Sequence, residues 1–197
     1  MSTKHIIAVY NLASVVDIQQ GQTWYSRAFI FARNLAAQYN IDTATIVGVI
    51  AALSPRNRWE RNMQDAESMV KVYANGGDYE DLMNLKVCTF KTGKDKAARI
   101  LTDKIADRDE LLSTLKGPKL CEFFNCILGD SEDVCIDGHA YSIWVGDRIT
   151  LANVPSIGVK LRKNIKADYQ EAAKILGVQP HVVQAITWVT WKRLHNV

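Results

Sequence analysis

Hydrophobic residues recur at helical spacing along most of the chain, and this pattern predicts an all-α protein of about ten short helices. Proline and glycine residues separate the periodic segments, as expected at helix ends. The residues 134–136 form the one strand-like stretch, and three residues are too few to begin a sheet. The expected helices are 6–12, 24–39, 46–53, 58–73, 78–85, 93–105, 109–115, 119–128, 139–144, 169–176 and 180–194.

Length and charge narrow the class of protein only slightly. The 197 residues, 48% of them hydrophobic, suffice for one well-buried core or for two lobes around a cleft. With 24 Lys and Arg against 21 Asp and Glu, the net charge of +3 permits a polyanionic partner without requiring one. The sequence contains neither an apolar run of membrane-spanning length nor a secretion signal, so we expect no membrane partner. We therefore expect a cytoplasmic protein, in the host cytoplasm if a phage encodes it.

The cysteines give no sign of a metal centre. None of the four forms a C-x-x-C pair, and no other cluster has the spacing of metal ligands. We expect reduced, buried thiols, no metal and no cofactor. The four are Cys88, Cys121, Cys126 and Cys135.

Chemistry is most strongly indicated between residues 115 and 140. A predicted helix ends in a Gly-Pro turn, and Lys119 opens the next helix. A short extended link then brings Asp137 to the start of a further helix, where free N–H groups and the helix dipole favour a carboxylate. The same dipole disfavours the cationic form of Lys119, and a lysine that loses its proton is a potential nucleophile.

This arrangement resembles the helix-hairpin-helix DNA glycosylases of the endonuclease III class, the HhH-GPD superfamily. The hairpin reads Leu-Lys-Gly-Pro-Lys over residues 115–119, and the second motif reads Ile-Asp-Gly-His over residues 136–139. The 18 residues from Lys119 to Asp137 (137 − 119) match the spacing of the lysine and aspartate in that family. Further upstream, residues 50–57 with Asn62 and Ala66, and residues 92–101, are similar to other segments of the family.

The resemblance implies a two-lobed, all-α fold within a single domain, residues 1–197. The central lobe would span residues 42–137 and contain the hairpin 115–119, and the terminal lobe would combine residues 1–41 and 138–197. The hairpin is two residues shorter than in the family, and Pro118 stands where a second glycine is expected. No cysteine follows Asp137, so the iron–sulfur cluster of some members is absent.

The resemblance also implies an enzyme that cleaves or remodels a nucleobase in DNA. Asp137 would stabilise an oxocarbenium-like transition state, Lys119 would be the nucleophile, and His139 would orient the substrate or carry a proton. Each has a structural alternative, since Asp137 can be a helix cap, Lys119 a solvated lysine and His139 a packed one. The candidates for binding DNA or a flipped base are Arg56, Asn57, Trp59, Gly117, Tyr25 and Trp24.

Two other functions fit the same residues. Phage relatives of these glycosylases transfer an amine onto a 5-hydroxymethylpyrimidine in DNA, and a scaffold without catalysis could bind DNA or a host protein. The basic stretch 160–166, like Lys91, Lys94 and Lys96, can follow a phosphate backbone or be solvated, and for 160–166 we expect a solvated loop. The packing of Trp144, Trp188 and Trp191 in the core is expected. The identity of the base, the strandedness of the DNA and the oligomeric state stay open.

Overall fold

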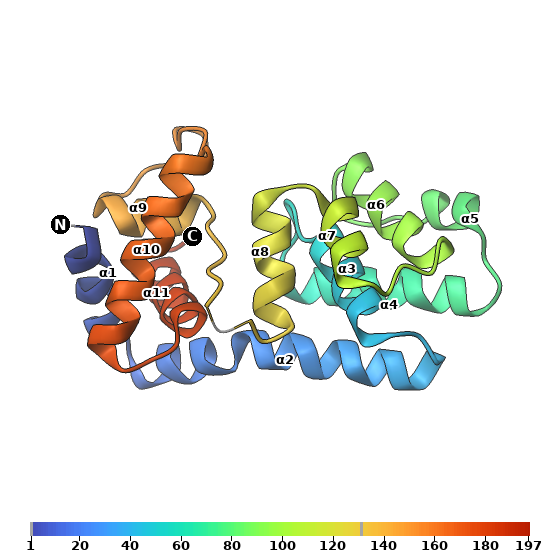
Figure 1. Cartoon of the computed structure of the whole chain (residues 1–197), viewed down its shortest axis with the longest axis horizontal. Coiled ribbons are helices and arrows are strands. Elements are labelled where there is room, and N and C mark those ends of the chain that lie inside the picture. The colour runs from blue at the N-terminus through green and yellow to red at the C-terminus, as the bar shows by residue number, and fades with distance from the viewer. Residues whose placement is uncertain (1, 131) are drawn as a thin grey trace. The chain divides into compact units, whose positions relative to one another are not determined.

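The computed structural model describes residues 2–130 and 132–197, and within them it contains helices and no strand (Figure 1). The expected all-α architecture is therefore confirmed. The helices are α1 (Ser2–Asn11), α2 (Val15–Tyr39), α3 (Thr43–Leu53), α4 (Trp59–Ala74), α5 (Tyr79–Asn84), α6 (Lys91–Thr102), α7 (Arg108–Leu115), α8 (Pro118–Ile127), α9 (Gly138–Val145), α10 (Val159–Leu176) and α11 (Pro180–His195).

The helices belong to two compact units. Unit 1 combines Met1–Tyr25 with Gly129–Val197, and unit 2 is the central segment Ser26–Leu128. Helices α1, α9, α10 and α11 lie in unit 1, helices α3 to α8 lie in unit 2, and α2 begins in unit 1 and ends in unit 2. The lobes expected from the sequence change over at residues 42 and 138, whereas the units change over at residues 26 and 129.

The core of unit 2 is built around α3. Every residue from Thr45 to Leu53 is buried, which requires hydrophobic neighbours on all sides of the helix. Helices α4, α6, α7 and α8 pack against it. The Asp42 side chain caps α3 by accepting a hydrogen bond from the backbone N–H of Ala44.

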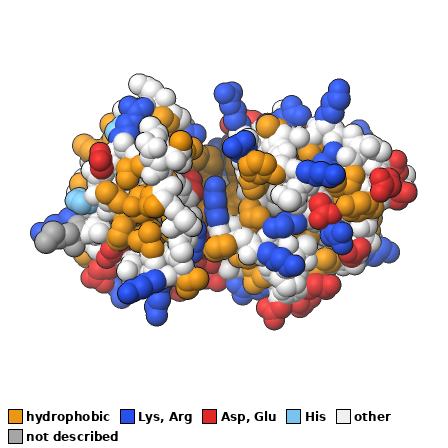
Figure 2. Space-filling view, turned by 90° about the horizontal axis from the view of Figure 1, so that it is seen from above, with side chains coloured by type: hydrophobic (Ala, Val, Ile, Leu, Met, Phe, Trp, Pro, Cys, Tyr) orange, Lys and Arg blue, Asp and Glu red, His pale blue; other side chains and the backbone are white. Residues whose placement is uncertain are grey.

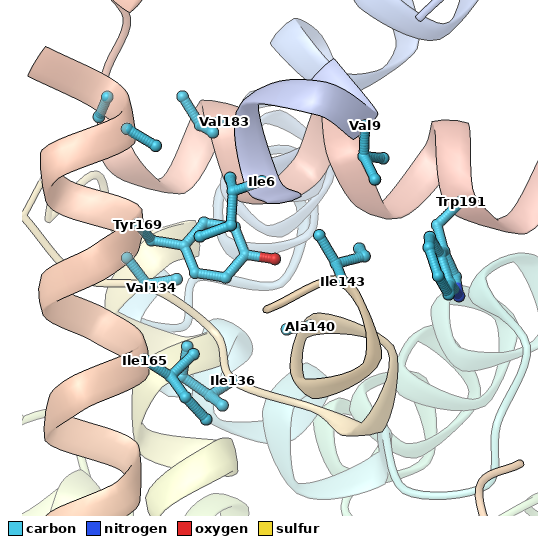
Figure 3. Close-up of a cluster of buried hydrophobic side chains, with 12 residues drawn as sticks. Ile6, Val9, Val134, Ile136, Ala140, Ile143, Ile165, Tyr169, Val183 and Trp191 are labelled. Carbon is cyan, nitrogen blue, oxygen red and sulfur yellow. The ribbon is translucent and has the colours of Figure 1, made fainter. Parts of the chain in front are cut away.

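The core of unit 1 surrounds Tyr169, whose ring reaches from α10 into a cluster of aliphatic side chains (Figure 3). The cluster draws on helices α1, α9, α10 and α11 and on the extended segment before α9, which has no sheet partner. Its buried members are Ile6, Val9, Val134, Ile136, Ala140, Ile143, Ile165, Tyr169, Ala172, Ala173, Val183 and Trp191.

The basic stretch 160–166 is helical, so the expected solvated loop is wrong. Helix α10 begins at Val159 rather than at Tyr169, because Leu161 and Ile165 extend the apolar stripe of Tyr169 by two further turns. Two cations of the stretch are also bound within unit 1. Arg162 donates to the carbonyl of Ile136 at 3.0 Å. Lys166 pairs with the buried Asp133 at 2.6 Å.

Helix α2 also begins earlier than expected, at Val15 rather than at Trp24. The reason is a reciprocal cap in which the Ser14 N–H donates to Asp17 Oδ2 and the Asp17 N–H donates to Ser14 Oγ. Asp17 is buried, and the same oxygen accepts a 2.8 Å hydrogen bond from Arg193 Nε of α11. The cap therefore joins the start of α2 to the end of α11.

Helices α2 and α11 approach closely at Gly21. A Cβ atom added to Gly21 would lie 2.5 Å from the Cα of Ile186, which is far inside van der Waals contact. Backbone atoms cannot move aside as a flexible side chain can. Gly21 is therefore required here for close packing, although glycine is unfavourable inside a helix.

We expect Gly21→Ala to destabilise the protein by about 1–3 kcal/mol, the usual cost of overpacking a core. The direction of the change in unfolding free energy is informative, because alanine in place of glycine inside a free helix would stabilise that helix by about 1 kcal/mol. Urea denaturation measures the change, with the exposed neighbour Gln22→Ala as a matched control. A Gly21→Ala variant as stable as the control would contradict the close approach.

Asp17 gives a prediction for the pH dependence of stability. Burial raises its pKa, but the hydrogen bonds from Ser14 and Arg193 outweigh that effect and hold the pKa below the ordinary value of 3.8. The charged form of Asp17 therefore stabilises the fold above pH 4, and this stabilisation is lost as the pH falls through the lowered pKa. Asp17→Asn keeps an acceptor for Ser14, so we expect a loss of about 1 kcal/mol at pH 7 that becomes smaller when the pH is lowered to 2.5. Urea denaturation at the two pH values measures the difference in unfolding free energy between the unaltered protein and Asp17→Asn. The same difference at both pH values would contradict the role of the charge.

Candidate functional site

Asp137 lies at the start of α9, as the sequence predicts. Its side chain is the helix cap, with Oδ1 accepting a 2.8 Å hydrogen bond from the backbone N–H of Ala140. The other oxygen, Oδ2, accepts a 3.1 Å hydrogen bond from the indole Nε1–H of Trp188 on α11. The carboxylate is half-buried, and each oxygen keeps a lone pair for a further contact. Unit 1 therefore holds a negative charge in a fixed position beside the positive end of a helix.

Trp188 is the residue of this site that the sequence did not reveal. It is half-buried rather than packed fully in the core, unlike the buried Trp191. Its ring centroid lies 5.0 Å from that of Trp24, and Lys192 Nζ lies 4.4 Å from the same ring. These neighbours fix the indole that donates to Asp137. The spacing of Trp188 and Lys192 by four residues was visible in the sequence, but nothing in the sequence linked them to Asp137.

His139 and Tyr169 complete the surroundings of the carboxylate. His139 is half-buried in the first turn of α9, and its ring meets that of Trp188 edge-on, with centroids 6.2 Å apart. Tyr169 is fully buried, and burial, together with the charge of Asp137, raises its pKa well above the ordinary value. The phenol therefore stays protonated at neutral pH.

The two aromatic residues expected to contact a base lie in different settings. Tyr25 is buried, its hydroxyl donates to Gln184 Oε1 at 2.6 Å, and its ring meets His181 edge-on. This position suits a structural role. Trp24 is half-buried and contacts Trp188, so it belongs to the surroundings of Asp137.

The residues of the predicted hairpin, 115–119, form a short turn between α7 and α8 in unit 2. Helix α7 ends at Lys116 in the left-handed conformation, Gly117 precedes α8, and Pro118 occupies its first position. Lys119 is exposed in the first turn of α8. The Nζ of Lys96 donates to the carbonyl of Leu115 and so fixes the end of α7. Lys119 lies in unit 2 and Asp137 in unit 1, so the joint action of the two stays a prediction.

The turn between α3 and α4 places its two polar residues differently. Arg56 is exposed, with a left-handed φ of 57°, and its guanidinium lies 4.7 Å above the ring of Phe90. Asn57 turns inward, where its Nδ2 donates to the carbonyl of Leu53 and to Asp65 Oδ2. Trp59, at the start of α4, is half-buried. Of the three residues predicted to contact DNA here, Arg56 is the exposed one.

Asp65 is the buried anion that holds this region together, and sequence reasoning did not select it. Its side chain is 4% exposed and accepts hydrogen bonds from Arg61 Nε at 2.6 Å, Asn57 Nδ2 at 3.0 Å and the Cys88 backbone N–H at 2.8 Å. The hydrogen bond that Arg61 donates to Asp65 raises the pKa of the Arg61 guanidinium. Asp65 thus joins the turn after α3 to the segment before α6.

The basic residues expected near α6 are partly structural. The Nζ of Lys94 donates to the carbonyls of Met83 and Leu85, and burial lowers the pKa of this amine. Lys94 therefore closes the end of α5, as Lys96 closes the end of α7. Lys91 is exposed.

Cys88 is exposed and Cys121 is half-buried, contrary to the expectation that all four thiols are buried. Within residues 2–130 and 132–197, no three His, Cys, Asp or Glu side chains gather in a way that could hold a metal ion. A groove of about 560 Å³ in unit 2 is bordered by the ends of α2, α4 and α6, and it contains none of the predicted site residues. None of the described helices combines the length and hydrophobicity of a membrane span.

These features define an all-helical protein of two compact units, with a hydrogen-bonded carboxylate at a helix start in one and a helical hairpin in the other. The chain matches the family of unknown function DUF7178 over residues 1–195, and it belongs to that family. Comparisons with curated proteins and with solved structures gave no match.

We expect Asp65→Ala to destabilise the protein by about 3 kcal/mol, because it leaves buried donors without an acceptor. Arg61→Ala is the matched control from the same ion pair. It should cost about 1 kcal/mol or less, since the Arg61 side chain is 50% exposed. Urea denaturation of both variants gives the comparison. Equal losses of unfolding free energy in the two variants would show that Asp65 contributes only its ion pair with Arg61.

Proposed function

We propose that the chain is a DNA-base-processing enzyme on a helix-hairpin-helix glycosylase-like scaffold, with Asp137 as its essential carboxylate. The observation that carries the proposal is the placement of Asp137, half-buried, capping α9 and hydrogen-bonded to the Trp188 indole. A fixed anion in a partly apolar site suits a reaction whose transition state gains positive charge.

The order of the chain through the two units supports the proposal. Both terminal segments belong to unit 1 and the central segment forms unit 2, which is the order expected of the two-lobed glycosylase fold. The hairpin before α8 lies in unit 2, and Asp137 lies in unit 1. The hairpin with Pro118 at the first position of α8 is also the feature in which the chain departs from that family.

In the proposed reaction the bond between C1′ of the deoxyribose and the base nitrogen breaks, and the electron pair leaves with the base. The sugar then carries positive charge, which the Asp137 carboxylate stabilises by roughly 3–4 kcal/mol. The oxygen of a water molecule adds to C1′ and passes its proton to Asp137 or His139. The same group then returns the proton to the nitrogen of the departed base, so the products are a neutral free base and an abasic site. The target base must leave the stack first, at a cost of a few kcal/mol.

Lys119 is the candidate for a nucleophile in place of water. Its amine would add to C1′, expel the base and continue to a Schiff base with the opened sugar. Reduction with borohydride would trap this intermediate as a covalent protein–DNA adduct, and Lys119→Gln would not form the adduct.

The test is mass spectrometry of nucleosides and free bases after incubation with DNA that carries ordinary, damaged and 5-hydroxymethylated pyrimidines. Asp137→Asn keeps a good helix cap and removes the charge, so we expect a loss of at least about 100-fold in turnover with the fold intact. Asp107→Asn is the matched control, because Asp107 caps α7 through the N–H groups of Asp109 and Glu110. Trp188→Phe keeps the ring and removes the N–H donor, which should cost about tenfold.

The outcomes separate the candidate functions. A free base or an abasic site that disappears in Asp137→Asn supports glycosylase chemistry. Intact DNA with a new nucleoside mass instead indicates base modification, with Asp137 taking a proton from the incoming amine. DNA binding without a change in any substrate contradicts the enzyme and leaves a binding protein. Equal loss of activity in Asp107→Asn would show that helix capping, rather than the charge, matters.

A further inference from the structure

The segment that follows α9 combines a strong charge bias with exposed aliphatic side chains. Between residues 148 and 166 there are five cations and no acidic residue. Arg162 and Lys166 are used within unit 1, as described above, and Arg148, Lys160 and Lys163 are exposed. Figure 2 shows, for one face of the molecule, that hydrophobic side chains and Lys and Arg side chains are both exposed at the surface.

Two aliphatic residues lie on the same segment. Leu151, in the loop before α10, is 62% exposed, and Val159, the first residue of α10, is 89% exposed. Both therefore present apolar surface close in sequence to exposed cations. Ile175 and Lys174 at the other end of α10 are exposed in the same way, and what distinguishes Leu151 is its contact with Gly138, beside Asp137. We call Arg148, Leu151, Val159, Lys160 and Lys163 the basic rim.

The basic rim is fixed next to Asp137 within unit 1. A Cβ atom added to Gly138 would lie 2.6 Å from Leu151 Cδ2, so the tip of Leu151 rests on the residue that follows Asp137. Ser142 Oγ of α9 lies 3.3 Å from the carbonyl of Ile149, and Arg162 binds the carbonyl of Ile136. A partner that contacts Leu151 therefore lies close to the start of α9, where Asp137 is the cap.

We propose that the basic rim is a DNA-contact surface. This inference rests on the proposed function and names the residues of unit 1 that would hold the substrate. Arg148, Lys160 and Lys163 contact phosphates, and the start of α10 adds the positive end of its dipole. Leu151 and Val159 lie against sugars and against bases that have lost their stacking partner, as aliphatic wedges do in other DNA complexes.

Charge and shape favour DNA over an anionic membrane. Arg148 precedes the two aliphatic residues along the chain, and Lys160 and Lys163 follow them. Charged and apolar positions therefore alternate, as the phosphates and sugars of a nucleic-acid backbone do. A membrane-binding surface needs a continuous apolar face with aromatic anchors, and residues 148–166 contain no aromatic residue. Binding to vesicles that contain anionic lipid is nevertheless measured alongside binding to DNA.

The first experiment measures duplex DNA binding by fluorescence anisotropy at several salt concentrations. Lys160→Gln should weaken binding about eightfold at 0.1 M salt and reduce the slope of log K against log salt by about 0.9, the values for one phosphate contact. Lys174→Gln is the matched control, because Lys174 is 78% exposed near the other end of the same helix. The control should bind as the unaltered protein does.

The second experiment tests the aliphatic contacts with the same assay on matched and mismatched duplexes. Leu151→Ser should abolish most of a preference for the mismatched duplex and leave the salt slope unchanged, since no charge is altered. Ile175→Ser is the control, with an aliphatic side chain that is 61% exposed near the C-terminal end of α10.

The results distinguish this inference from the proposed function. Weaker binding by Lys160→Gln and normal binding by Lys174→Gln support the DNA surface even if no base is released, in which case the proposed reaction alone fails. Equal binding by both lysine variants, or equal duplex preference by both serine variants, overturns the inference. Binding to anionic vesicles that depends on Lys160, without binding to DNA, also overturns it.

Discussion

A half-buried carboxylate is stable in a folded protein only if polar groups replace the water that it loses, and unit 1 supplies these groups to Asp137 from two directions. The backbone of α9 provides one donor and the Trp188 indole of α11 provides the other. The second hydrogen bond joins residues that are 51 positions apart, so it exists only when the core around Tyr169 has brought α9 and α11 together. The position of the carboxylate is thus a result of the packing of the whole unit, and the proposed chemistry depends on that packing.

Unit 2 uses a buried carboxylate in a different way. Asp65 has all its contacts within the protein, and these contacts hold two loops in place. Asp137 retains partial exposure and lone pairs that a substrate could use. The comparison shows why residue type alone does not identify a site. What separates the two aspartates is the number of partners and the access of solvent.

Much of the fold could be predicted from the sequence, because helix formation depends on local patterns. The helical periodicity, the cap at Asp42 and the cap at Asp137 are all local, and each is present in the structure. The start of α2 is also determined locally, by the cap between Ser14 and Asp17. The hydrophobic periodicity does not indicate it, because most residues between Asp17 and Trp24 are polar. The helical conformation of 160–166 is harder to predict, because four of its seven residues are cationic. What decides the conformation is the packing of Leu161 and Ile165 against the core of unit 1.

The candidate site was less predictable, since its partners are remote in sequence. No periodicity links Trp188 to Asp137 or Asp65 to Cys88. Lys94 shows a related limit: its amine binds the backbone carbonyls of Met83 and Leu85, and a carbonyl is present whatever side chain stands at its position. Substitutions at positions 83 and 85 would therefore leave these hydrogen bonds in place, whereas a substitution of Lys94 would remove them. Methods that infer contacts from correlated substitutions would not detect this one, and an invariant lysine there would reflect the closing of a helix rather than a ligand.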